Sequence, residues 1–328
     1  MDLFEVIKKS RPNLKESSIK TYINNLNKLA KEIGIKEIKN LDFLKNGGNI
    51  IRALQKKKEA TQKTYLASIV VILKAIDTDE RSSKLGGKAS VKKNLIDFYT
   101  EKMNELMENY NQKISKKEKT ESQEQNWIEL AELKKEIEKQ GKEITRMRLW
   151  DKKKLSPAEF DQIQKYVAGA LYLISDENPP LRSDYADMKL ICDKDYNNLS
   201  KEELKDNYIV DVSKQNKFFH LGDYKTNKTY GNKKIKVGKK LNNILNKWFK
   251  INGSGYLLVN NRKKPMTANS LGKYMNKVFE PTGKKIGVSL LRHIYISDRF
   301  PAEKLDEKEK VANMMLHSVS MQNDYSKK

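Results

Sequence analysis

Two arginines, a lysine, a histidine and a tyrosine stand in the C-terminal half of this sequence in an order that suits phosphodiester chemistry: Arg182, Lys225, Arg292, His317 and Tyr325. A catalyst that breaks a phosphodiester must neutralise the phosphate oxygens, position a nucleophile and protonate the leaving oxygen. Arginine donates two parallel hydrogen bonds to phosphate, a phenol forms a phosphotyrosyl ester, and lysine beside other cations acts as an acid. The set therefore predicts phosphodiester cleavage that needs no metal.

The sequence around the two arginines favours a bound anion. Arg292 lies among apolar residues in VSLLRHIYIS, where a buried unpaired charge is costly. Arg182 follows two prolines and a leucine in PPLRSDY, and its alternative role is an ion pair with Asp184 or Asp187 at a helix end. We interpret both arginines as phosphate ligands.

The lysine and the tyrosine have rivals nearby. Lys225 competes with Lys228, Lys233 and Lys234 in the same predicted hairpin. Tyr325 competes most closely with Tyr295, which follows a helical apolar pattern and is interpreted as a core residue. We select Lys225 as the acid and Tyr325 as the nucleophile.

A metal-dependent site is the competing route to the same chemistry, and it needs clustered carboxylates. Asp184 and Asp187 have no obvious third ligand, and the DKD run at 193–195 is separate from the arginines. The one cysteine, Cys192, cannot form a cysteine-rich zinc site. We expect neither a metal nor another cofactor.

The overall charge indicates an anionic partner. The 328 residues include 66 Lys and Arg against 43 Asp and Glu, a formal charge of +23. Nucleic acid ranks first among the partners of such a chain, ahead of acidic proteins and anionic membranes. No stretch approaches the roughly 18 apolar residues of a membrane span, and MDLFEVIKKSRPN lacks the order of a signal peptide. We expect no membrane association and no secretion.

Apolar periodicity predicts three segments. Residues 1–78 have helical spacing and are expected to form a helical domain. Residues 79–150 are expected to be a polar linker followed by a charged helical hairpin or spacer. In residues 151–328, a helix that opens at Ser156–Pro157 precedes the strand-like runs YIVDVS, KFFHLGDYKT and KKIKVGKK, and helical patterns then return. The chain is thus expected to be mainly α with a small β-sheet, and its last segment to be α+β.

The C-terminal half resembles the catalytic domain of the tyrosine recombinases, the family of phage-type integrases. In order, Arg182, Lys225, Leu291-Arg292-His293, His317 and Tyr325 match the family's first arginine, hairpin lysine, H-x-x-R-H box, third-box histidine and nucleophile. The PPLRSDY context resembles integrase-like proteins of large eukaryotic DNA viruses. The resemblance implies a helical core-binding domain in residues 1–78 and a catalytic domain in residues 151–328.

The sequence departs from the family pattern at two places. Ser289 stands where the box begins with histidine; serine can bond a phosphate oxygen but cannot act as an imidazole base. Leu316 stands where the family usually has glycine before His317. We assign Ser289 and His293 secondary places in the site, and interpret His293 as a packed, hydrogen-bonded residue.

The resemblance implies a site-specific recombinase or integrase of a virus or mobile element that cleaves and rejoins DNA through a 3′-phosphotyrosyl intermediate. Its partner is then double-stranded DNA, and it works as a homo-multimer on paired sites. It is expected inside the cell, wherever the target DNA lies, in a host nucleus or a viral replication compartment. Two alternatives stay open: a type IB topoisomerase, and a non-catalytic DNA-binding protein descended from recombinases.

Overall fold

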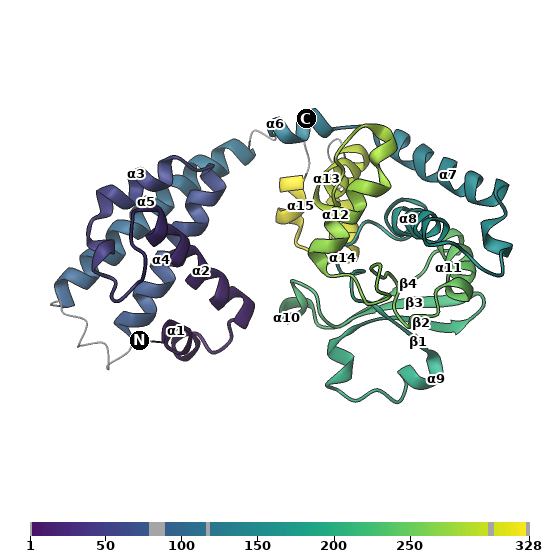
Figure 1. Cartoon of the computed structure of the whole chain (residues 1–328), viewed down its shortest axis with the longest axis horizontal. Coiled ribbons are helices and arrows are strands. Elements are labelled where there is room, and N and C mark those ends of the chain that lie inside the picture. Colours follow the sequence, from purple (N-terminus) through teal and green to yellow (C-terminus); the bar gives the residue numbers. More distant parts are fainter. Residues whose placement is uncertain (1, 79–88, 116–118, 301–304, 326–328) are drawn as a thin grey trace. The chain divides into compact units, whose positions relative to one another are not determined.

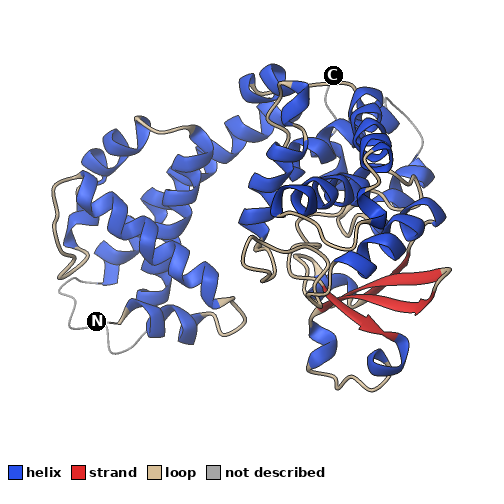
Figure 2. Cartoon of the chain, turned by 45° about the vertical axis from the view of Figure 1, so that its right-hand side comes forward, coloured by secondary structure: helices blue, strands red, loops and turns tan. Residues whose placement is uncertain are grey.

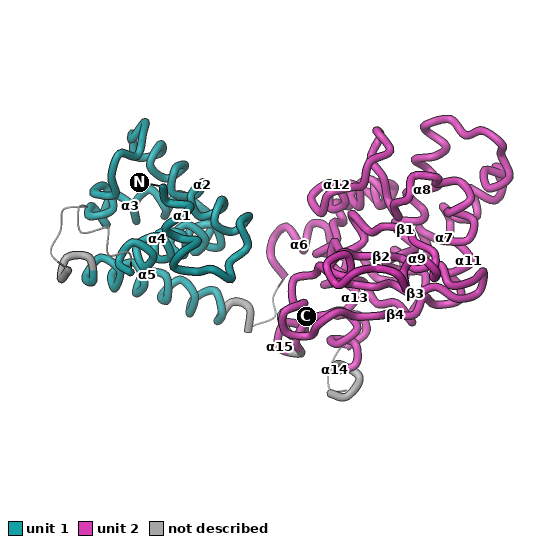
Figure 3. Tube along the Cα trace, turned by 90° about the horizontal axis from the view of Figure 1, so that it is seen from below, with its two compact units in different colours: residues 1–116 teal, residues 117–328 magenta. Residues whose placement is uncertain are grey.

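The computed structural model describes residues 2–78, 89–115, 119–300 and 305–325. The chain divides into two compact units, residues 1–116 and 117–328 (Figure 3). Most of the linker expected at residues 79–90 lies outside the described residues, which resume at 89. The division between the units falls after residue 116, whereas the sequence pattern predicted boundaries at residues 78 and 150.

Unit 1 is built from helices (Figure 1), as the apolar spacing predicted. These are α1 (Leu3–Ser10), α2 (Glu16–Glu32), the 3₁₀ turn η1 (Asp42–Lys45), α3 (Gly47–Gln55), α4 (Glu59–Asp77) and α5 (Ala89–Ser115). In α2, Ile19, Leu26 and Leu29 recur at helical intervals and are fully buried. The apolar faces of the helices thus close a core that belongs to this unit alone.

Helix α5 belongs to unit 1, whereas the sequence had indicated a spacer. It packs along α4. Tyr99 is fully buried, and its hydroxyl donates to the carbonyl of Leu44 at 2.7 Å. Phe98 lies against Gly47, where an added Cβ would come within 2.5 Å of the ring. Sparse apolar residues are enough to bury one face of this helix, because α4 is apolar around most of its circumference.

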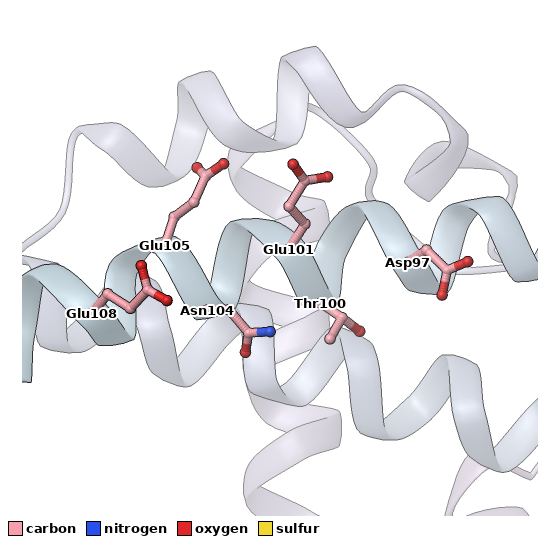
Figure 4. A pocket seen from close by; sticks show the side chains of 6 residues that line it. All are labelled: Asp97, Thr100, Glu101, Asn104, Glu105 and Glu108. Carbon is pink, nitrogen blue, oxygen red and sulfur yellow. The ribbon is translucent and has the colours of Figure 1, made fainter.

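The other face of α5 is acidic. Figure 4 shows Asp97, Glu101, Glu105 and Glu108 following one another along this helix beside Thr100 and Asn104, where they line a shallow pocket. Lys102 pairs with Glu105 at 2.8 Å. This face is locally acidic although the chain as a whole has a formal charge of +23.

Unit 2 combines helices with one small sheet (Figure 2). Its helices are α6 (Glu121–Asn126), α7 (Leu130–Arg146), η3 (Leu149–Asp151), α8 (Pro157–Leu173), α9 (Asp193–Tyr196), η4 (Glu203–Lys205), α10 (Asn227–Tyr230), α11 (Lys239–Ile251), α12 (Ala268–Val278), η5 (Glu280–Thr282), α13 (Val288–Arg299), α14 (Leu305–Met314) and α15 (Val319–Tyr325). Its strands are β1 (Lys189–Cys192), β2 (Asn207–Ser213), β3 (Asn216–Leu221) and β4 (Lys233–Lys236). The prediction of a mainly helical chain with a small sheet is confirmed.

Helix α7 packs on α8 in unit 2, whereas α5 packs on α4 in unit 1. Ile137 of α7 is fully buried against Gly169 of α8, where an added Cβ would lie 2.1 Å from the isoleucine side chain. The short helix α6 starts at a reciprocal capping box that Thr120 and Gln123 form.

The sheet has the order β1-β2-β3-β4, with β1 parallel to β2 and the other pairs antiparallel. Alternation along β3 sends Phe219 and Leu221 into the main core and Phe218 to the opposite face, where it meets Tyr196 of α9. Strand β4 closes the edge with lysines, which discourage pairing with another strand. The β3–β4 connection, which carries Lys225, leaves the sheet at the end of β3.

Neither a membrane span nor a metal-ligand cluster is found in the part of the chain that the structure describes. None of its helices has the length and apolar character that crossing a bilayer requires. No three His, Cys, Asp or Glu side chains in these ranges lie together as a ligand set. Cys192 is exposed at the end of β1.

Candidate active site

Four of the five predicted site residues come from separate segments of unit 2 and converge. Arg182 lies in the loop between α8 and β1, Arg292 in α13, His317 in the turn between α14 and α15, and Tyr325 at the end of α15. Helix α15 packs on both α13 and α14. The convergence therefore depends on how this short helix is docked.

Arg292 is only 2% exposed although it carries a full charge. Its Nη1 donates to the Tyr325 hydroxyl at 3.4 Å, and its guanidinium carbon lies 4.8 Å from the centre of the tyrosine ring. Its Nε and Nη2 are buried without a hydrogen-bond partner among the described residues. An unpaired buried polar group costs about 1–3 kcal/mol. Two such nitrogens on one guanidinium are a site for an acceptor that binds from solution.

Arg182 is held through its backbone as well as its side chain. Its carbonyl accepts from the Tyr172 hydroxyl at 2.8 Å, and its N–H donates to the Asp184 carboxylate at 3.1 Å. Its Nη1 donates to the carbonyl of Leu316 at 3.0 Å. Because Leu316 immediately precedes His317, this bond joins Arg182 to the turn that carries His317.

His317 is 1% exposed and has one unused ring nitrogen. Its Nδ1 lies 2.9 Å from the Ser318 carbonyl, which can only accept, so Nδ1 carries the proton and Nε2 of the neutral ring is an acceptor. Nε2 is buried with no partner in the described part of the chain. Burial lowers the pKa of His317 to about 4, and the cations of Arg292 and Arg182 act in the same direction, against the bond to Ser318.

Tyr325 is fixed at its backbone and sandwiched at its ring. Its carbonyl lies 3.0 Å from Nδ1 of His293 and accepts from the Ser297 hydroxyl at 3.4 Å. Its ring packs edge-on against His293 at 4.7 Å between centres and lies 5.5 Å from His317. His293 thus packs against the ring of Tyr325 and forms a hydrogen bond with its main chain.

Lys225 is exposed in the β3–β4 connection, two positions before α10 begins. Its ammonium group makes no ion pair with the described residues. The next residue, Thr226, does reach the cluster: its hydroxyl donates to the Leu316 carbonyl at 2.5 Å. The structure therefore brings the backbone beside Lys225 to the arginines and leaves the lysine side chain extended into solvent.

Ser289 is exposed in the first turn of α13, three positions before Arg292. Leu316, at the position where the resemblance implies glycine, has a left-handed backbone with φ of 57°. Glycine adopts this conformation without strain, whereas a residue with a Cβ does so rarely. Leu316 thus has a left-handed backbone in this turn although it is not glycine, the residue that favours this conformation.

The charges of the pocket do not balance. Arg182 and Arg292 lie close enough to Asp184 to lower the pKa of its carboxyl, yet burial is the larger effect and raises that pKa overall. Burial also lowers the pKa of Arg292 to about 10, so the guanidinium stays charged at neutral pH. The guanidinium groups of Arg182 and Arg292 therefore face one carboxyl group, that of Asp184, whose ionisation burial disfavours. One further anion would balance the charge.

Four contributors to the arrangement were not recognised from the sequence. The Leu316 carbonyl is a main-chain group with no side-chain signal. Asn207 and Thr226, which tie the Lys225 connection to its surroundings, are ordinary polar residues in the sequence. Asp184 was noticed only as a possible ion-pair partner of Arg182, and the raised pKa that burial gives it depends on the fold.

No protein-family model matches this chain, and no curated protein sequence matches it. Among solved structures, it is similar to a crystal structure of XerA recombinase, with a TM-score of 0.38 and 10% identity over 99% of this chain and 92% of that one. A similarity of this degree does not extend to activity. The geometry of Arg182, Arg292, His317 and Tyr325 has to carry the functional argument by itself.

Proposed function

We propose that this protein breaks and rejoins DNA strands, with Tyr325 attacking a phosphate that Arg182 and Arg292 hold. One observation carries the proposal: Nε and Nη2 of Arg292 and Nε2 of His317 are buried around the same tyrosine side chain and have no hydrogen-bond partner among the described residues. A phosphate supplies acceptors to the guanidinium and a negative charge to a pocket that lacks one. The attacking oxygen already lies 3.4 Å from Nη1 of Arg292.

The proposed cleavage step balances as follows. The Tyr325 oxygen bonds to phosphorus while its proton passes to Nε2 of His317, the acceptor left free by the bond from Nδ1 to Ser318. The bond between phosphorus and O5′ breaks, and Lys225 gives a proton to the departing oxygen. The imidazolium so formed then donates to a phosphate oxygen. Attack by a 5′-hydroxyl reverses every transfer and releases the tyrosine.

His317 is the proton acceptor because Ser289 cannot be one. The resemblance to tyrosine recombinases places a histidine where Ser289 stands, and a serine hydroxyl has no basic lone pair of comparable strength. The pKa of His317, lowered to about 4 by burial, keeps its ring neutral at physiological pH. One side chain is then the base before the attack and a hydrogen-bond donor after it.

The formal charge of +23 supports double-stranded DNA as the substrate. Contacts to backbone phosphates give salt-dependent affinity and leave the target sequence undetermined. The acidic face of α5 repels a duplex and is therefore not expected to contribute to such contacts. Recombination between paired sites by a homo-multimer follows from the resemblance alone.

Covalent trapping tests the proposal. A pool of nicked duplexes with randomised sequence, in which cleavage releases a short fragment that cannot religate, is incubated with the wild type. We expect a 3′-linked covalent complex whose labelled peptide is the one that contains Tyr325. Tyr325→Phe should form none, and Tyr295→Phe, a change on α13, should match the wild type. Protein that binds the pool without becoming linked would favour a non-catalytic DNA-binding protein.

Strand exchange and topoisomerase activity are separated by a second assay on the duplex found by trapping. A recombinase needs two copies of its site, and products join DNA from different molecules. A type IB topoisomerase relaxes a supercoiled plasmid that carries one copy. We expect joined products from paired sites.

A further inference from the structure

The connection that carries Lys225 is tied down on its N-terminal side by Asn207. This residue is 5% exposed at the start of β2. Its Oδ1 accepts from the N–H groups of Gly222 and Asp223 at 3.0 and 2.9 Å, and its Nδ2 donates to the Asp223 carbonyl at 2.8 Å. The same Nδ2 lies 3.3 Å from the carbonyl of Asp184. One side chain thus joins the start of the connection to the loop that follows Arg182.

On its C-terminal side the connection is tied by Thr226. The Thr226 hydroxyl and Nη1 of Arg182 both donate to the Leu316 carbonyl, at 2.5 and 3.0 Å. Leu316 has the left-handed φ of 57°, and a strained backbone of this kind persists where its surroundings hold it. The carbonyl is therefore a shared anchor for the first arginine and for the residue after Lys225.

The segment between the two ties is itself restrained. Gly222 passes so close to the main chain ahead of β2 that an added Cβ would lie 2.2 Å from the Leu204 carbonyl. Tyr224 is 5% exposed, and its hydroxyl donates to the Gly231 carbonyl at 2.5 Å. Lys225, between a buried tyrosine and an anchored threonine, is exposed. Its backbone is fixed while its side chain stays free to reach a substrate.

We propose that Asn207 and Thr226 are positioning residues that hold Lys225 in register with Arg182, so that the ammonium group meets the leaving oxygen of the phosphate that Arg182 binds. The inference rests on the proposed function and adds residues that act through Lys225. Its physical basis is that both ties end on the two segments that also fix Arg182: the Asp184 carbonyl and the Leu316 carbonyl. Displacement of a catalytic group by about 1 Å is enough to slow a reaction by two orders of magnitude.

The chemistry of the leaving group offers a readout that a merely structural role does not move. With oxygen at the 5′ position, the bond between phosphorus and O5′ breaks only as Lys225 supplies a proton. With sulfur there, a thiolate leaves without that proton, because thiols are far stronger acids than alcohols. A defect in placing Lys225 is therefore rescued by the 5′-thio substrate, and a defect in holding the phosphate is not.

The test compares Thr226→Val with the wild type on one duplex that the wild type cleaves, made with oxygen or sulfur at the scissile 5′ position. We expect Thr226→Val to form the phosphotyrosyl complex about 10- to 100-fold more slowly with oxygen, and at close to the wild-type rate with sulfur. Thr226→Ser, which keeps the hydroxyl, should restore the oxygen rate. Thr229→Val, an exposed change in α10, is the matched control and should behave as wild type.

Two reference variants give the result its meaning. Lys225→Ala should lose about 10²- to 10⁴-fold with oxygen and recover with sulfur. Arg182→Lys should be slow with both. Asn207→Ala, checked for folding by circular dichroism, should follow the Thr226→Val pattern.

The outcomes separate the inference from the function beneath it. Thr226→Val that cleaves the oxygen substrate as fast as wild type, or that stays slow with sulfur, overturns the positioning role and leaves the proposed chemistry standing. Wild-type protein that forms no covalent complex with any duplex in the pool overturns both.

Discussion

The guanidinium of Arg292 is stacked on the ring of the tyrosine whose hydroxyl it contacts. Its carbon lies 4.8 Å from the ring centre of Tyr325, and its Nη1 lies 3.4 Å from the hydroxyl oxygen. The two residues meet because α15 docks on α13. A cation over the ring face is favourable, but Nε and Nη2 have no hydrogen-bond partner in the part of the chain that the structure describes. The arrangement favours ligand binding at the expense of stability.

Replacing Arg292 by methionine is expected to stabilise the folded protein. Methionine has a similar length and is apolar, so the change removes a buried charge with two unpaired nitrogens. Exchanging such a charge for an apolar residue stabilises proteins by about 1–4 kcal/mol in favourable cases. Thermal unfolding measures the change. A lower melting temperature would mean that the guanidinium is better satisfied than the contacts indicate.

Inorganic phosphate is the control for the same variant. A ligand that binds only the folded protein raises its melting temperature, and we expect such a rise for the wild type and none for Arg292→Met. Arg299→Met, a change at an exposed arginine of the same helix that pairs with Asp176, should keep the response. Equal shifts in all three proteins would place the phosphate elsewhere.

The low pKa of His317 predicts acid lability. Its folded-state pKa is lowered to about 4 from an ordinary 6.5, so between these values the unfolded chain binds a proton that the folded chain does not. Above pH 6.5 His317 makes its full contribution to the free energy of unfolding. This contribution is lost as the pH decreases toward 4, by up to roughly 3 kcal/mol.

Denaturant unfolding at a series of pH values checks this sign. His220, whose pKa is also lowered by burial, contributes a loss in the same direction, so the comparison is with His317→Asn. The variant should lose less stability between pH 6.5 and 4 than the wild type. Equal slopes would show that His317 is not buried as a neutral ring.

Gln322 has a buried side-chain amide in α15, three residues before Tyr325. It is 1% exposed in α15, and neither its Nε2 nor its Oε1 has a partner among the described residues. Gln322→Met keeps the length of the side chain and removes both groups. We expect about 1–3 kcal/mol of added stability, seen as slower proteolysis after α15 unfolds locally. Faster proteolysis would indicate that the amide is paired.

Tyr99 tests whether α5 is part of unit 1. Tyr99→Phe removes the hydroxyl that donates to the Leu44 carbonyl and leaves that buried acceptor unpaired. The expected loss is about 1–3 kcal/mol in thermal unfolding of the unit. Tyr22→Phe, at a half-buried tyrosine of α2, serves as the control and should be near neutral. If both variants melt alike, α5 does not depend on this bond.

Local signals in the sequence predicted helix α8 well. Ser156 caps it, Pro157 occupies its first turn, and Glu159 completes the reciprocal capping box. These contacts span three positions, so the sequence alone contains them. The strand runs of β2, β3 and β4 were found for a similar reason, since alternation is local.

Sequence patterns predicted secondary structure less well where contacts with a distant segment determine it. Strand β1 is a short strand whose one neighbour in the sheet, β2, begins 15 residues after β1 ends. The segment 89–115 looked like a spacer because its apolar residues are sparse, and only α4 shows that they suffice. The predicted hairpin that carries Lys225 contains the short helix α10, and Thr226 ties the connection before this helix to the Leu316 carbonyl.

From the sequence alone came the kinds of chemistry available, the excess of positive charge and the periodic elements, because residue types, net charge and short-range spacing need no folding. Tertiary structure decided that Arg182, Arg292, His317 and Tyr325 meet, and that the nitrogens facing the pocket are left unpaired. Burial and hydrogen-bond satisfaction depend on what packs from distant segments. The Leu316 carbonyl makes the point most sharply: its role comes from a backbone direction, which no residue type encodes.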